Sequence, residues 1–253
     1  MKHNYFQLFS ILAWTDFKLR YHGSILGFLW ALLKPILIFL ILNFVFSNIF
    51  GRGDPYFSVR LLLGIVLWNF FAEGTMMGMI SLHSKAAIIT KVKFPLWIVV
   101  VASIANIMLT FLINLGIFSV FLIIAKGIPS LTQVAVFLYY VVLITMVIMS
   151  FSFITSTLFI KLRDLNQVWE VLLIAGFYAC PIIYPISVIP RNVQWVIFLN
   201  PMTFVIQYSK LVLIEGKFQN LTLHIIYTLI VVAVFLFGIW VFSRNAKKVP
   251  EHL

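Results

Sequence analysis

The sequence predicts an all-α integral membrane protein that has six transmembrane helices, an N-terminal amphipathic helix at the membrane interface, and short re-entrant helices between spans five and six. Two observations lead to this prediction. Of the 253 residues, 63% are hydrophobic and only 10% are charged, whereas soluble domains have roughly 45–50% apolar and about 25% charged residues. The apolar residues also form long runs without charges, close to the ~20 residues that a helix needs to cross a bilayer.

Six apolar runs mark the candidate spans. They cover residues 28–50, 61–80, 95–125, 133–160, 166–183 and 221–243. The third and fourth runs exceed the length that a hydrocarbon core of ~30 Å requires, so we expect those helices to tilt, kink or protrude. The runs leave no length for a sizeable soluble domain, and we therefore interpret residues 1–253 as a single transmembrane domain.

The basic residues predict the orientation. Six spans place both termini on one side, and 12 of the 18 Lys and Arg residues fall on that side against 6 on the other. This bias predicts a multi-pass protein of the inner (cytoplasmic) membrane with both termini in the cytoplasm. The net charge is +11, but the basic residues punctuate apolar runs. They do not cluster on one polar face, so we expect membrane lipids as partners and no nucleic acid.

Two segments differ from both spans and ordinary loops, and the first covers residues 4–22. It carries an apolar stripe at helical spacing, formed by Tyr5, Leu8, Phe9 and Leu12. A second stripe, interrupted only by Ile11, is polar and contains Asn4, Gln7, Thr15, Lys18 and His22. This pattern predicts an amphipathic helix that lies at the cytoplasmic interface.

Residues 181–220 form the second segment, in which prolines interrupt apolar stretches that are too short to cross. These prolines are Pro181, Pro185, Pro190 and Pro201. Irregular backbone exposed to lipid is not tolerated at membrane depth. We therefore expect the segment to lie on the outer surface or to be buried among helices as short re-entrant elements.

The chain carries no recognisable catalytic or nucleotide-binding motif. A P-loop requires G-x-x-x-x-G-K-[ST], but the only Gly-Lys pair, Gly216-Lys217, is followed by Phe218. The seven Asp and Glu residues are scattered, and the single cysteine, Cys180, excludes an intrachain disulfide. We therefore predict no catalytic residue, no metal site and no cofactor bound by this chain.

Two charged residues lie within or beside apolar runs. Glu73 is the one carboxylate well inside a run, and an ionisable group at membrane depth is by default a functional candidate because leaving it unpaired is costly. An equally good interpretation is that Glu73 pairs with a neighbouring helix or reaches a wet cavity without a chemical role. Lys34, directly before Pro35, is expected to snorkel to the interface.

Four short motifs carry a family resemblance. The first is DFKLRYHGSILGFLW, from Asp16 to Trp30, closed by Pro35. The others are KVKFP at residues 91–95, then Arg163-Asp164, and then Pro181, Tyr184, Pro185 and Asn200-Pro201. In this order, and with the predicted topology, the chain resembles the membrane (permease) subunits of type-two ABC exporters, particularly those for O-antigen polysaccharide and teichoic acid.

The resemblance implies ATP-driven export of a lipid-linked O-antigen polysaccharide across the inner membrane. It implies a homodimer of this subunit and two copies of a cytoplasmic ABC ATPase, which would bind ATP and Mg. The amphipathic helix would rest in a groove of the ATPase, and residues 84–94 would form a gate or coupling element. The charged residues expected at this contact are Asp16, Lys18, Arg20, Lys91, Lys93, Arg163 and Asp164. Such charges would set the register of a rigid-body push.

A hydrated glycan needs a conduit with flat aromatic faces and few fixed charges. The residues expected to line it are Phe39, Asn43, Phe46 and Phe50 on span one and Trp169, Phe177 and Tyr184 along span five. Packing against lipid or other helices is an equally good interpretation for any one of them. The resemblance also implies an outer gate, formed by Pro181, Pro185, Asn200 and Pro201. The pyrophosphate of a lipid carrier would be attracted by Arg20, Lys34, Lys91 and Lys93.

Three alternatives remain open from the sequence alone. The same architecture would serve an exporter of teichoic acid, a drug or another lipid. An integral-membrane glycan or lipid transferase would need a polar catalytic cluster, which the sequence does not show. A membrane assembly scaffold would need no gate, and the long segment broken by prolines disfavours it.

Overall fold

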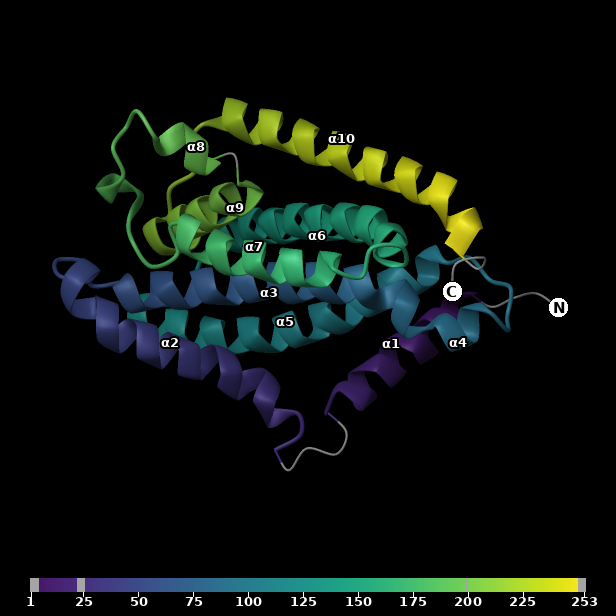
Figure 1. Ribbon diagram of the computed structural model, residues 1–253. Helices are drawn as coiled ribbons and strands as arrows, with labels where there is room; N and C mark the ends of the chain where they lie inside the picture. The colour runs from purple at the N-terminus through teal and green to yellow at the C-terminus, as the bar shows by residue number, and fades with distance from the viewer. Residues whose placement is uncertain (1–4, 22–25, 199, 250–253) are drawn as a thin grey trace.

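The computed structural model describes residues 5–21, 26–198 and 200–249, and within them it contains helices and turns but no β-strand (Figure 1). The α-helices are α1 (Tyr5–Tyr21), α2 (Leu29–Phe50), α3 (Phe57–Ser84), α4 (Ala86–Ile89), α5 (Trp97–Lys126), α6 (Leu131–Phe159), α7 (Leu165–Ala179), α8 (Gln194–Phe198), α9 (Pro201–Lys210) and α10 (Leu221–Asn245). Two 3₁₀ helices, η1 (Ile186–Val188) and η3 (Ala246–Lys248), and one π-helical turn, η2 (Leu211–Glu215), complete the set. The all-α prediction is confirmed for the described residues.

Among the described residues, five helices are long and apolar enough to cross a membrane, namely α2, α3, α5, α6 and α10. They coincide closely with five of the predicted spans. The exception is the span predicted over residues 166–183, because α7 has only 15 residues. At 1.5 Å per residue it is about 22 Å long, which falls short of a ~30 Å hydrocarbon core. The helix ends at Ala179 because Pro181 and Pro185 have no N–H with which to extend it.

Local sequence signals set where some helices begin. Ser130 opens α6 with a capping box: its hydroxyl accepts a hydrogen bond from the Gln133 N–H (3.3 Å), and the Gln133 side chain accepts one from the Ser130 N–H (2.7 Å). Asn200 caps α9 by accepting from the Met202 N–H (2.9 Å), and Pro201 occupies the first helical position. The Asn-Pro pair of the sequence therefore starts a short helix.

α3 is the central helix of the bundle. Of its most apolar window 72% is buried, against 17–39% for the other four long helices. α5 and α6 are its main neighbours, and α2, α7 and α9 also contact it. Small residues allow α6 to approach closely: a Cβ on Gly74 would lie 2.9 Å from Ile148, and one on Gly78 would lie 1.9 Å from the Ser152 hydroxyl. Gly-x-x-x-Gly spacing is a common basis of helix packing in membranes.

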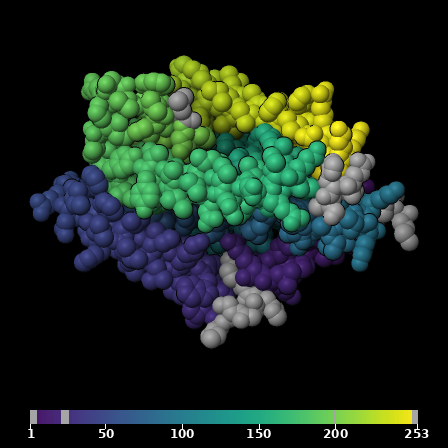
Figure 2. Space-filling model, viewed as in Figure 1, coloured from purple at the N-terminus to yellow at the C-terminus, as the bar shows by residue number. Residues whose placement is uncertain are grey.

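The two ends of the bundle differ. α8 and α9 lie at the end where α2 stops and α3 begins, whereas α4 and the last turns of α10 lie at the opposite end (Figure 1). We call these the α9 end and the α4 end. α7 covers the middle of the face shown in Figure 2, between α2 and α10, and the segment that follows it lies at the α9 end. All the long helices therefore run between one end that carries residues 181–220 and another that carries the loops predicted to be cytoplasmic.

α1 packs along α5 with one face and leaves the other exposed. Leu12 and Ala13 are buried and Leu8 and Phe9 half-buried, whereas Tyr5 is exposed. The exposed face mixes apolar and polar side chains: Phe6, Gln7, Ile11, Trp14, Thr15 and Lys18. Asn4 and His22, at the ends of the predicted amphipathic segment, lie outside the described residues. The helix is thus less cleanly amphipathic than the sequence pattern predicted.

The contact between α3 and α6 gives a stability prediction. We expect Gly78→Val to destabilise the protein, because the new side chain would collide with Ser152 and force the two helices apart, and overpacking of this kind costs about 1–3 kcal/mol. Gly116→Val on α5 is the matched control, since a Cβ there meets nothing within 4 Å. Thermal unfolding of both variants in the same detergent measures the difference. Equal midpoints would contradict the tight contact.

Candidate functional site

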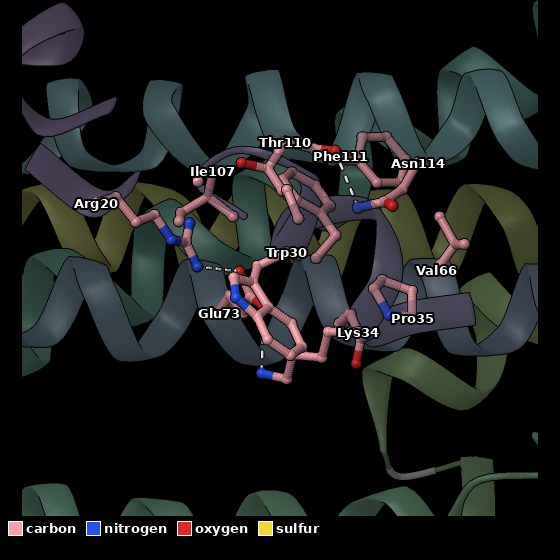
Figure 3. A pocket seen from close by; sticks show the side chains of 14 residues that line it. Arg20, Trp30, Lys34, Pro35, Val66, Glu73, Ile107, Thr110, Phe111 and Asn114 are labelled. Atoms are coloured by element: carbon pink, nitrogen blue, oxygen red, sulfur yellow. Dashed lines mark hydrogen bonds and ion pairs between the residues drawn. The ribbon is translucent and has the colours of Figure 1, made fainter. Parts of the chain in front are cut away.

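The main candidate site is a cavity of about 190 Å³ enclosed by α2, α3 and α5 and reached by the end of α1. Its polar lining consists of Arg20, Lys34, Asn69, Glu73, Thr110 and Asn114. Figure 3 shows Arg20, Glu73 and Lys34 joined on one side of the cavity, with Thr110 and Asn114 across from them on α5. Convergent polar groups in an otherwise apolar bundle are typical of a binding site.

Glu73 joins three helices at this cavity. The guanidinium of Arg20, on α1, donates to one carboxylate oxygen and forms an ion pair with it. The Nζ of Lys34, on α2, lies 3.7 Å from the other oxygen. The Arg20 and Glu73 side chains are only 24% and 25% exposed, which explains why the carboxylate needs a partner. The structure thus shows the pairing with neighbouring helices that the sequence left as one of two interpretations.

α5 contributes a polar face beside the cavity. Asn106, Thr110 and Asn114 recur every four residues and are all buried, and the Asn114 side chain donates to the Thr110 carbonyl (3.1 Å). Beside this face, Nδ2 of Asn69 on α3 and Oδ1 of Asn106 are among the buried atoms that have no hydrogen-bond partner within the described part of the chain. Buried polar atoms nearly always have a partner. The unpaired amide of Asn69 at the cavity wall therefore indicates a place for water or a ligand group.

The seven predicted coupling residues separate into two groups. Asp16 and Arg20 turn inward, where Asp16 pairs with Lys85 at the end of α3 and Arg20 pairs with Glu73. These two ion pairs fasten α1 to the central helix. The others are exposed, namely Lys18, Lys91, Lys93, Arg163 and Asp164. The structure therefore gives the two groups different environments, and contact of either with an ATPase stays a prediction.

The four residues predicted to attract a pyrophosphate are likewise divided. Arg20 and Lys34 meet at the cavity. Lys91 and Lys93 lie in the exposed loop between α4 and α5 and line none of the described cavities.

The α2 residues predicted to line a conduit have unlike surroundings. Phe39 is buried with its ring edge-on to Phe121 of α5. Asn43 accepts a hydrogen bond from the Ser58 hydroxyl (2.8 Å). Phe46 and Phe50 are half-buried and stack on each other, with centroids 6.0 Å apart. Within this chain Phe39 is a packing residue, whereas Phe46 and Phe50 retain exposed surface.

The aromatic residues of α7 and beyond hold that helix to the bundle. The Trp169 indole donates to the Thr75 hydroxyl (3.0 Å) and stacks on Phe151. Phe177 meets Trp68 of α3 edge to face. These side chains anchor α7 against α3 and α6, so the α7 surface left for a conduit is the opposite one.

The backbone just after α7 is satisfied by side chains from other parts of the chain. The Tyr184 hydroxyl donates to the carbonyls of Tyr178 (3.1 Å) and Ala179 (2.9 Å). The Nζ of the buried Lys210, on α9, donates to the carbonyls of Pro181 (2.6 Å) and Ile182 (3.1 Å). The exposed carbonyls of Tyr178 and Ala179 and the buried carbonyls of Pro181 and Ile182 are therefore paired within the protein, as irregular backbone at membrane depth requires.

The four predicted gate residues lie at this break or beside it. The carbonyl of Pro181 accepts from Lys210, and Pro185 directly follows Tyr184, whose hydroxyl bonds to the last turn of α7. Asn200, which caps α9 before Pro201, also donates through Nδ2 to the Cys180 sulfur (3.1 Å). The proline-broken segment is part exposed, at η1 and α8, and part buried, at α9. Burial and the neighbouring Arg60 cation lower the pKa of Lys210, which lies outside the five long helices, to about 7.

The π-helical turn after α9 is held in the same way. Its carbonyls accept from Gln133 Nε2 at Val212 (2.9 Å) and from Lys126 Nζ at Leu213 and Ile214. Isolated π-turns are frequent at functional sites. Sequence reasoning missed Lys210, Lys126, Gln133 and Asn69, because nothing in their local sequence distinguishes them from loop lysines and helix amides. The spacing of Gly74 and Gly78 in the sequence is a usable signal for the close contact between α3 and α6.

Comparison with known proteins adds independent information. Residues 7–212 match the ABC-2 type transporter family. The chain is 30% identical, over its whole length and 98% of the relative, to the O-antigen export system permease protein RfbA of Klebsiella pneumoniae. A second K. pneumoniae protein of that name is 29% identical over 90% of this chain and 89% of its own length. A Myxococcus xanthus protein of that name is 26% identical over 86% and 84%.

The reactivity of Cys180, the only cysteine in the sequence, can test whether Lys210 holds the segment after α7. We expect Lys210→Met to loosen the segment after α7, because it leaves the carbonyls of Pro181 and Ile182 unpaired, at about 1–3 kcal/mol for each buried group. Cys180 is buried beside this segment, so its labelling by a maleimide should become faster. Lys217→Met is the control, since that side chain is 61% exposed. Unchanged labelling of Cys180 in Lys210→Met would show that the lysine does not hold the break.

Proposed function

The chain belongs to the ABC-2 type transporter family, and on that basis we propose that it is the transmembrane subunit of an ATP-driven exporter that moves a lipid-linked O-antigen polysaccharide across the inner membrane. The observation that carries the proposal is the similarity to O-antigen export permeases, which extends over 100% of this chain. The five long apolar helices agree with it. The family resemblance of the four sequence motifs is confirmed by the family match.

The topology we propose has six crossings within one domain, residues 1–253, with both termini in the cytoplasm. α7 makes the fifth crossing together with the non-helical residues that follow it. Two facts support this: α7 packs along α3, and Cys180, Ile182 and Ile183 are buried in protein. The buried α9 then serves as a re-entrant element, and the α4 end faces the cytoplasm.

Energy comes from a separate subunit in this proposal. Two copies of a cytoplasmic ABC ATPase bind ATP and Mg and dock at the α4 end of a homodimer of this chain. Two exposed features at this end are suitable for such a contact. They are the outer face of α1, with Trp14 and Lys18, and the charged residues of the loops. The loop charges are Lys91, Lys93, Arg163 and Asp164. Movement of α1 would reach the central helix through the pairs Asp16–Lys85 and Arg20–Glu73.

The conduit would be lined by the side of α2 and α7 that stays exposed in the single chain. Phe46, Phe50 and Tyr184 keep exposed surface, and aromatic faces suit the apolar faces of sugar rings. The other predicted lining residues would support these side chains from behind, because they pack on other helices. They are Phe39, Asn43, Trp169 and Phe177. We expect the double variant Phe46→Ala/Phe50→Ala to export less glycan, whereas the control Phe237→Ala on α10 should export normally. Unchanged export by the double variant would refute this lining.

The lipid carrier would bring its pyrophosphate to the cytoplasmic half of the bundle. Arg20 and Lys34 lie together there, and Lys91 and Lys93 are exposed in the nearby loop. Teichoic acid or another lipid-linked polymer offers the same phosphate chemistry. The names of the relatives favour O-antigen.

The dependence on an ATPase is the direct test of the proposed function. We expect the purified subunit, reconstituted in sealed vesicles, to move lipid-linked polysaccharide only when its ABC ATPase partner and ATP are both supplied. The measurement is protection of the glycan from a glycosidase added outside. Transport by the isolated chain without any nucleotide hydrolase would refute the proposal. Equal transport of teichoic acid would refute the substrate assignment alone.

The exposed charges at the α4 end give a prediction about coupling. We expect the double variant Lys91→Gln/Lys93→Gln and the variant Arg163→Gln to lower export at least about ten-fold, equivalent to about 1.4 kcal/mol, while the subunit itself remains folded. The reason is loss of charge complementarity with the ATPase. Arg191→Gln and Lys217→Gln, at the α9 end, are the controls and should export normally. Export lowered equally by all four variants would point to a general charge effect.

A further inference from the structure

The cluster formed by Arg20, Glu73 and Lys34 borders a second cavity as well as the polar one. This cavity, about 280 Å³ in volume, is also lined by Ala72, Met76 and Met77 of α3 and by Leu173 of α7. The three charged side chains line both cavities. They therefore form the wall between an open, mostly apolar cavity on the α7 side and a polar one enclosed by α2, α3 and α5.

The charge of this wall is unbalanced. Two cations face a single carboxylate, so the cluster retains one positive charge. Lys34 is 64% exposed and lies 3.7 Å from Glu73, which leaves its ammonium able to bind a second anion. A phosphoryl group carries about 1.5–2 negative charges near neutral pH and has three acceptor oxygens. Arg binds such a group through two parallel hydrogen bonds, so a phosphoryl group competes well with one carboxylate.

The polar cavity behind the wall offers neutral donors. The Asn69 amide nitrogen is buried at its lining and has no hydrogen-bond partner among the described residues. Asn114 presents a second side-chain amide. With about 190 Å³ the cavity has space for several waters, each of which occupies about 30 Å³ in the liquid. This is enough for one phosphoryl group.

We propose that Arg20, Lys34 and Asn69 form a binding site for the pyrophosphate of a lipid in the membrane, and that Glu73 occupies the site as an internal anion until the lipid displaces it. The lipid chain would remain in the apolar cavity beside Met76, while the phosphoryl oxygens take over Arg20. This inference rests on the proposed function for the identity of the lipid.

Displacement of Glu73 would also be a signal to the ATPase. Arg20 belongs to the last turn of α1, and its bond to Glu73 is, among the described residues, one of two ion pairs that join α1 to α3 or its end. When phosphoryl oxygens replace the carboxylate, this link between α1 and α3 is lost, and α1 keeps the pair of Asp16 with Lys85 and its packing along α5. Substrate binding would in this way alter the helix that the proposed function places against the ATPase.

Direct binding tests the site without relying on transport. The subunit, purified with its ATPase and placed in vesicles, is titrated with a fluorescent polyprenyl pyrophosphate. We expect Arg20→Gln to weaken binding about ten-fold or more, as for loss of a charged hydrogen bond, and Lys34→Gln to weaken it several-fold. Glu73→Gln should instead tighten binding several-fold, because the competing anion is gone. Glu170→Gln, an exposed carboxylate on α7, is the control and should leave binding unchanged.

The signs of these changes separate the proposal from a structural role. If Glu73 only supports the fold, Glu73→Gln will weaken binding or leave it unchanged, and the proposal fails. Lys34→Gln provides a second test, since a largely exposed side chain can be replaced without unfolding the protein. Phosphatidylglycerol vesicles or inorganic pyrophosphate in solution can be added as competitors of the probe. If either competes as well as an unlabelled polyprenyl pyrophosphate, the site binds bulk anionic lipid or free anions, and the proposal of a lipid pyrophosphate site is refuted.

Failure of this inference is distinguishable from failure of the proposed function. If the wild-type complex exports glycan with ATP but the three variants show none of the expected changes in affinity, the proposed site is refuted and the proposed function stands. If instead the complex binds the probe as expected but never exports glycan with ATP, the proposed function is refuted and the site remains a binding site for an anionic lipid.

Discussion

A hydrocarbon layer offers no hydrogen-bond partner to a backbone group, and this constraint accounts for most of what the chain builds. It requires helices wherever the chain meets lipid. It also requires that every place where a helix stops early be repaired from within the protein. The end of α7 and the π-turn η2 are such places, and Tyr184, Lys210, Gln133 and Lys126 supply the donors. Charged side chains are therefore used here to satisfy carbonyls as well as to pair with acids.

The same shortage of polar partners explains the arrangement around α3. Helices in lipid gain little from burying apolar surface, so they associate through close packing and a few polar contacts. Gly74 and Gly78 let α6 approach, and the Trp169 indole donates to Thr75. Glu73 is the costly exception in this helix, and two cations compensate for it. The most buried helix thus carries both the close Gly74 and Gly78 contacts and the Glu73 carboxylate, which joins α1, α2 and α3.

α1 connects the surface of the α4 end to this centre. Its inner face places Asp16 and Arg20 against α3 and its extension, while Trp14 and Lys18 face outward. A soluble partner that moves the outer face would move the ion pairs too, because an α-helix transmits displacement as a rigid body. The proposed lipid site uses the same Arg20, so that cargo and energy source would act on one helix from its two sides.

The sequence by itself determined the class of the protein, five of its long helices and the family to which it belongs, because apolar runs and short motifs are properties of the chain read in order. It also identified Glu73 as the one carboxylate well inside an apolar run, and it named Arg20 and Lys34 as residues that would attract a pyrophosphate. It did not reveal that these three meet, that Asp16 turns toward Lys85, or that α7 stops at Ala179 with Lys210 beneath it. Those pairs are separated by tens of residues or more. Only the packing of the helices brings them together, since a side chain reaches a few ångströms and local sequence contains no record of which distant helix will lie within that reach.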